Sequence, residues 1–104
     1  MQLSISRKNA NVHVEISGAI KNRDEISLKH EFAKINMEPH KKVILDLTSV
    51  PAISSLGISR IFLLYKEQKK QGGEVIIQGI HKNLYKQFIS FGLDRHIKIE
   101  DKEN

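Results

Sequence analysis

Two adjacent hydroxyls and a nearby glycine form the most informative polar cluster of the chain, Ser54-Ser55-Leu56-Gly57. The cluster stands directly before an apolar periodic segment, so Ser54 is expected to cap a helix and Ser55 to lie in its first turn. A hydroxyl in a first turn points away from the core, where a modifying enzyme can reach it. Gly57 costs about 1 kcal/mol in a helix relative to alanine, which suggests that another segment approaches its backbone closely. Taken by themselves, the serines also fit simple helix capping.

Other residue types that catalyse reactions or bind metals do not form recognisable patterns. A hydrolase needs a nucleophile, a base and an orienting acid, and residues of these types are present: Ser55, His81, His96, Asp46 and Asp94. The Gly-x-Ser-x-Gly elbow of many hydrolases is absent. The histidines are scattered without a His-x3-His pair, and the chain lacks a P-loop. We therefore expect no enzymatic activity, no metal site and no cofactor.

Composition bounds the class of protein. The 104 residues are 39% hydrophobic and 28% charged, which fits one globular domain over residues 1–104, with residues 100–104 as a frayed tail. The chain has no cysteine, so we expect no disulfide and a reducing, cytoplasmic location. The first residues do not resemble a signal peptide. No apolar run approaches the roughly 20 residues needed to span a bilayer, so membrane insertion is not expected.

The net charge of +5 raises the question of a nucleic-acid partner. The lysines occur in short, scattered groups, and the chain has no arginine-rich arm or basic stretch interleaved with aromatic residues. We interpret the lysines as covering solvated faces. No specific nucleic-acid binding is expected.

The elements that must position the serine cluster follow from hydrophobic periodicity. Alternating apolar residues predict two N-terminal strands that form an antiparallel hairpin. Further strands are predicted over residues 42–47, 74–79 and 97–99, and helices over 24–36, 55–71 and 82–91. Asp24 is expected to cap the first helix through its carboxylate. The order predicts an α/β fold with a mixed four- to five-stranded sheet and helices packed against it.

Three segments resemble the signature of the STAS family. The segment from Asp46 to Ile58 is similar to its Leu-Asp-Leu strand end followed by Asp-Ser-Ser-Gly at a helix start. Residues 72–79 are similar to the family's Gly-Gly turn and following strand, and residues 91–94 to its terminal turn. Together they cover residues 40 to 99, and the first 40 residues fit by pattern only. The resemblance implies the STAS fold.

The resemblance also implies a role for Ser55, which matches the serine that a partner kinase phosphorylates in the family, while Gly57 matches the motif glycine. Two residues depart from the motif: Ser54 stands at its acidic position and Leu56 at its third position. The carboxylate of the motif is therefore absent beside Ser55.

The leading functional hypothesis is a regulatory, anti-sigma factor antagonist-like module that works by binding a protein. The resemblance implies a partner that is both an anti-sigma factor and a serine kinase of the histidine-kinase-like ATPase type, and it allows a PP2C-like phosphatase as a further partner. The loop before the second helix and its exposed face would bind, at Ser54, Ser55, Leu56, Gly57, Ser59 and Arg60. The alternative is a non-catalytic STAS subunit of a membrane lipid-transport ABC complex. We expect a monomer in isolation, because one sheet uses up the apolar stripes.

Overall fold

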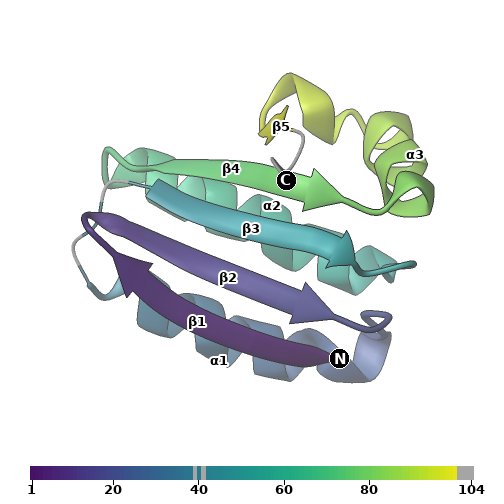
Figure 1. Ribbon diagram of the computed structural model, residues 1–104, viewed down its shortest axis with the longest axis horizontal. Helices are drawn as coiled ribbons and strands as arrows, with labels where there is room; N and C mark the ends of the chain where they lie inside the picture. The colour runs from purple at the N-terminus through teal and green to yellow at the C-terminus, as the bar shows by residue number, and fades with distance from the viewer. Residues whose placement is uncertain (39, 41, 101–104) are drawn as a thin grey trace.

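In the part of the chain that the structure describes, five strands form one mixed sheet, and each strand lies beside the next one in sequence. The computed structural model describes residues 1–38, 40 and 42–100. The strands are β1 (Gln2–Lys8), β2 (Asn11–Ser17), β3 (Lys42–Ser49), β4 (Glu74–Ile80) and β5 (Lys98–Glu100). The predicted hairpin is confirmed, because β1 pairs with β2 antiparallel, and every later pairing is parallel (Figure 1).

Among the described residues, three α-helices connect the parallel strands: α1 (Glu25–Asn36), α2 (Ser55–Lys70) and α3 (Lys82–Ser90). Two short 3₁₀ turns, η1 (Asn22–Asp24) and η2 (Leu93–Arg95), precede α1 and follow α3. The helices α1 and α2 lie side by side on one face of the sheet, whereas α3 lies beyond the end of β4 (Figure 1). The predicted α/β architecture with a mixed sheet is therefore confirmed.

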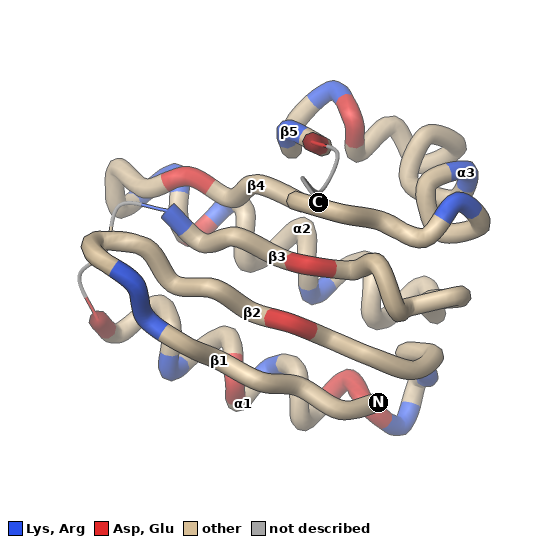
Figure 2. Tube along the Cα trace, in the orientation of Figure 1, with Lys and Arg blue, Asp and Glu red and all other residues tan. Residues whose placement is uncertain are grey.

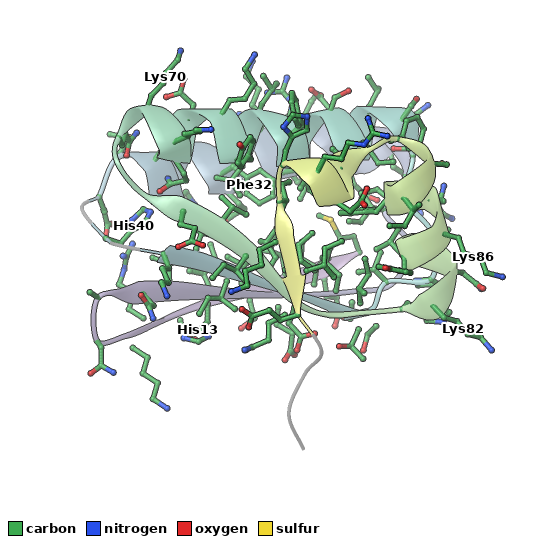
Figure 3. All side chains as sticks on the ribbon, turned by 90° about the horizontal axis from the view of Figure 1, so that it is seen from above. His13, Phe32, His40, Lys70, Lys82 and Lys86 are labelled. Atoms are coloured by element: carbon green, nitrogen blue, oxygen red, sulfur yellow. The ribbon has the colours of Figure 1, made fainter. Side chains whose placement is uncertain are left out.

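The core lies between that helix pair and the sheet. Alternate residues of β2 and β3 are fully buried, and so is one stripe of each helix. Burying a side chain of this kind contributes about 1.5–3 kcal/mol. Figure 3 shows Phe32 of α1 between the helices and the sheet, with His13 of β2 on the opposite face. That opposite face is more polar, which explains the alternation of apolar and polar residues along β1 and β2.

The prediction for Asp24 was wrong. Its carboxylate accepts a hydrogen bond from the backbone N–H of Lys21 at 2.8 Å and makes no bond to the first turn of α1. Because η1 leads directly into α1, the backbone of Asp24 has helical angles (φ −87°, ψ −7°), whereas side-chain capping needs an extended residue. The carboxylate therefore closes the preceding turn.

Two strand boundaries also differ from the prediction. β3 continues to Ser49, which pairs with Ser17, and the Asp46 carboxylate accepts from the backbone N–H and the hydroxyl of Thr48 at 3.0 and 2.7 Å. Glu100, expected in the frayed tail, is the last residue of β5. The rest of that tail, residues 101–104, lies outside the described residues.

A buried amide joins the far ends of the two central helices. Gln68 of α2 exposes only 1% of its surface. Its Nε2 donates to Asn36 Oδ1 at 2.6 Å, and its Oε1 lies 2.6 Å from His40 Nε2. Since an amide oxygen only accepts, His40 is the donor in the second bond. The network therefore ties the end of α2 to the end of α1 and to the segment before β3.

Replacing Gln68 by methionine, which has a similar volume, should lower the free energy of unfolding by about 1–3 kcal/mol, because two partly buried partners lose their hydrogen bonds. Urea unfolding followed by circular dichroism measures the change. Gln78→Met, on the open face of the sheet, is the control and should alter stability by less than about 0.5 kcal/mol. Equal effects of the two substitutions would show that the network contributes nothing to stability.

Candidate functional site

The start of α2 is held by the segment that follows β2. The backbone N–H of Ile20 donates to Ala52 O at 3.0 Å, and the N–H of Ser54 donates to Ile20 O at 2.9 Å. Ile20 and Ile53 also form an isolated parallel bridge. These contacts extend the pairing of β2 and β3 beyond the ends of both strands. They fix the loop that leads from β3 into α2.

Gly57 lies where that segment meets the helix. A Cβ atom built on Gly57 would lie 2.8 Å from Ile20 Cγ2 and 2.8 Å from Ile53 Cγ1, and both isoleucines are buried. This separation is far shorter than the 3.5–4.0 Å at which carbon atoms normally pack. The expectation that another segment approaches the backbone of Gly57 is therefore confirmed.

The two serines have different surroundings. Ser54 is extended (φ −74°, ψ 162°), and its Oγ accepts from the backbone N–H of Gly57 at 3.2 Å, so its predicted capping role is confirmed. Ser55 is the first residue of α2 and is exposed to solvent. A charged group attached there would lie beside the free N–H groups and the positive end of the helix dipole.

The remaining predicted contact residues lie on different sides of α2. Leu56, which is 46% exposed, and Ser59 share the solvent-facing side with Ser55. Gly57 is buried. Arg60 faces α1, where its Nη2 and Nε lie 2.6 and 2.7 Å from Glu25 Oε1. The structure thus groups two serines and one leucine on an accessible surface and engages the arginine in a contact within the chain.

Sequence reasoning missed the exposed apolar residues next to this surface. Helical periodicity predicts Phe62 in the buried stripe of the second helix and Phe91 on one face with Leu84 and Phe88, but Phe62 is half-buried and Phe91 is 57% exposed. Leu63 is 45% exposed. A signal was available for Phe91, since it directly precedes Gly92 and follows the last turn of α3, where helical periodicity no longer assigns a face.

The described residues contain neither a candidate metal site nor a candidate membrane-spanning helix. No group of three or more His, Asp or Glu side chains among them is arranged to hold a metal ion. No helix in the described part of the chain is long and apolar enough to cross a membrane. Basic and acidic positions are interspersed over the strands and helices (Figure 2), which agrees with lysines that cover solvated faces.

The arrangement of a buried strand, a clamped loop and a capped helix carrying an exposed serine has counterparts in known proteins. The family model of the STAS domain matches residues 3–104. The chain belongs to the STAS family. Its membership agrees with the observed mixed sheet and with the three segments that resemble the family signature.

Solved structures share this STAS fold. An anti-sigma factor antagonist from Mycobacterium paratuberculosis has a TM-score of 0.85 and 16% identity over 95% of this chain and 84% of its own. The anti-sigma factor antagonist SpoIIAA, in its unphosphorylated form, has a TM-score of 0.82 and 15% identity over 99% of this chain and 90% of its own. A sulfate transporter family protein from Wolinella succinogenes has a TM-score of 0.78 and 23% identity over 89% of this chain and 78% of its own.

Substituting Gly57 by alanine tests the close contact in this STAS domain. In an open helix the change would stabilise by about 1 kcal/mol, but a crowded methyl group costs about 1–3 kcal/mol. We expect a net loss of up to about 2 kcal/mol in thermal or urea unfolding. Ser59→Ala, on the exposed side of the same helix, is the control and should alter stability by less than about 0.5 kcal/mol. A Gly57→Ala variant more stable than the wild type would contradict the contact.

Substitutions of Ser54 and Ser55 should also differ in their effect on stability. Ser54→Ala removes the cap and should cost about 1 kcal/mol. Ser55→Ala removes an exposed hydroxyl and should alter stability by less than about 0.5 kcal/mol. Melting curves of both variants measure the difference. A larger loss for Ser55→Ala than for Ser54→Ala would reverse the assigned roles.

Proposed function

We propose that this STAS domain is a regulatory binding module of the anti-sigma factor antagonist kind, without catalytic activity of its own. The observation that carries the proposal is an exposed hydroxyl, Ser55, on a helix start that the Gly57 contact holds in one position. The exposed residues of α2 nearest to it, Leu56 and Ser59, are uncharged. Such a surface suits a protein partner that distinguishes a hydroxyl from a phosphate.

The proposed partner is an anti-sigma factor that is also a serine kinase of the histidine-kinase-like ATPase type. It would bind the unphosphorylated domain through Ser54, Ser55, Leu56 and Ser59, with Arg60 at the edge of the contact, and would phosphorylate Ser55. A PP2C-like phosphatase would restore the hydroxyl. The proposal is supported by the structural likeness to two anti-sigma factor antagonists, one of them described in its unphosphorylated form.

Phosphate at Ser55 would act on the partner more than on the fold. It adds about −1.5 to −2 charge at neutral pH. At the first turn of α2 this charge meets the positive end of the helix dipole, which stabilises it by about 0.3–1 kcal/mol. A partner surface shaped around a hydroxyl would instead face added bulk and the cost of desolvating the phosphate. A loss of about 3 kcal/mol in binding corresponds to a more than hundredfold weaker complex.

Ser54 stands where the family motif has an aspartate, and this difference leaves the local geometry intact. An aspartate at this position would accept the same hydrogen bond from Gly57 N–H, because Ser and Asp are comparable N-cap residues. Ser54 therefore replaces the capping function of the motif carboxylate while removing its negative charge. A kinase of this chain would have to recognise Ser55 without that charge.

A second candidate is a non-catalytic subunit of a membrane lipid-transport ABC complex. One observation favours a transport setting, namely the structural likeness to a sulfate transporter family protein. In that role the same face of α2 would dock permanently and Ser55 would remain unmodified. The two functions therefore differ in whether a negative charge at Ser55 abolishes binding.

The test measures binding of the full chain to a histidine-kinase-like ATPase from the same genome by calorimetry. Ser55→Asp should stay folded and bind at least about a hundredfold more weakly, whereas Ser55→Ala should bind like the wild type. Ser27→Asp, at an exposed serine in the first turn of α1, is the matched control and should retain affinity. With ATP, mass spectrometry should detect one phosphate on the wild type and none on Ser55→Ala.

Equal affinity of well-folded wild type and Ser55→Asp would rule out the phosphate switch and favour the permanent subunit. Phosphate on Ser55→Ala would assign the modification to another residue. Ester or ATP hydrolysis by the purified chain that Ser55→Ala abolishes would exclude a module that only binds.

A further inference from the structure

An open apolar groove runs along one side of α2 and begins one helical turn after Ser55. It has a volume of about 410 Å³, and α2 lines it with Ile58, Ser59, Phe62 and Leu63. The segment after α3 supplies the other wall, with Phe91, Leu93 and His96. Leu63 and Phe91 are 45% and 57% exposed, whereas Ile58 and Leu93 are buried. Neighbouring apolar side chains exposed to this degree are typical of a contact surface.

Two lysines border the end of the groove that is distant from Ser55. Lys66 Nζ lies 5.8 Å from the centroid of the Phe62 ring, and Lys69 Nζ lies 5.7 Å from that of Tyr65. Each lysine follows its ring by one helical turn, and the Tyr65 ring contacts the groove residues Phe62 and His96, with 5.8 and 6.1 Å between ring centroids. Both ammonium groups therefore lie on the groove side of α2. Neither lysine forms an ion pair with another residue that the structure describes. This end of the groove is therefore positively charged and open to a carboxylate from outside the described chain.

The other charges beside the groove do not offset these lysines. Asp94 and Arg95 are neighbours in η2 and contribute opposite charges. Arg60 lies on the other side of α2, where Glu25 neutralises it. The charge that a bound molecule would meet is therefore that of Lys66 and Lys69, next to an apolar wall.

We propose that the groove receives a short amphipathic helix of the regulatory partner, with apolar side chains against Phe62, Leu63 and Phe91 and carboxylates beside Lys66 and Lys69. Helices bind grooves of this kind through apolar residues spaced by three or four positions. Complementary charge at one end sets the direction in which the helix lies and raises the association rate. The inference rests on the proposed function, since it adds a second contact for the same partner on the same helix.

The length of α2 sets the size of the bound helix. Lys66 follows Ser55 by three helical turns, which is about 16 Å at a rise of about 1.5 Å per residue. A partner helix of about three turns therefore spans the groove. The same distance exceeds the electrostatic screening length of about 8 Å at physiological salt. A phosphate on Ser55 and the two lysines should consequently affect binding independently.

The test uses the full chain and two synthetic helical peptides of about three to four turns, a length taken from the helix rise. Both carry leucines at positions i, i+3, i+4 and i+7 in an alanine-rich background. One ends in glutamates and the other in lysines. In titrations of the ¹⁵N-labelled chain, the acidic peptide should shift the amide signals of residues 58–66 and 91–96. It should also bind at least about tenfold more tightly than the basic peptide at low salt, and the preference should fade as salt rises.

Substitutions locate the contact. Phe91→Ser and Lys66→Glu should each weaken binding of the acidic peptide at least about fivefold, the lower limit of a clear interface effect. Met37→Ser, at an 84% exposed apolar residue where α1 ends, is the control and should leave binding unchanged. If Phe91→Ser proves unstable in melting curves, Leu63→Ser on the opposite wall replaces it. Lys66→Glu should also reduce the preference for the acidic peptide.

Equal binding of the two peptides, no binding of either, or signal shifts outside the groove would overturn the inference. A dimer in light scattering that Phe91→Ser disperses would assign the groove to a second copy of this chain and would also overturn it. The peptides are measured without the partner kinase, so this result is separate from that of the Ser55 variants. Acidic-peptide binding together with unchanged kinase affinity of Ser55→Asp would reject the phosphate switch and retain the groove.

Discussion

The position of α2 depends on the absence of a side chain at residue 57. The helix backbone there lies against the side chains of Ile20 and Ile53, at a separation that leaves no room for a Cβ atom. The backbone of Ile20 also bonds to Ala52 and Ser54, which holds the loop that leads into the helix. Ser55 lies between this loop and Gly57. Its hydroxyl is therefore exposed at a helix start that cannot shift without disturbing the core.

Polar contacts fix α2 relative to α1 at two separate points. Near its start, Arg60 binds Glu25 through two guanidinium nitrogens, with both side chains about three-quarters or more buried. Near its end, the buried side chain of Gln68 binds the partly buried Asn36. An ion pair of this kind adds little net stability, because desolvating the charges offsets their attraction, but directional bonds at both ends favour one alignment of the two helices. The side of α2 that faces away from α1 is left to carry the exposed serines and the groove.

Local chemistry was sufficient to predict the parts of the site that depend on neighbours in sequence. The capping role of Ser54 and the crowding at Gly57 follow from residue types at a helix start, and the strands and helices follow from periodicity. The burial of Gln68 could not be predicted, since its partners Asn36 and His40 lie 32 and 28 residues away. The exposure of Phe91 was missed for a related reason, because periodicity identifies an apolar residue but not the element that covers it. The helical geometry of Asp24 depended on a 3₁₀ turn for which the sequence has no periodic pattern.

The residues that hold the candidate site in position differ from the residues that form its exposed surface. Gly57, Ile20 and Ile53 are confined by packing, whereas Ser55, Leu56 and Ser59 are exposed to solvent in the isolated chain. Substitutions at the exposed positions therefore change the free energy of unfolding very little, whereas substitutions at the packed positions lower it. In evolutionary terms, the choice of partner can drift or be reassigned after gene duplication without passing through an unstable ancestor. One scaffold can in this way supply several pathways with domains that do not cross-react.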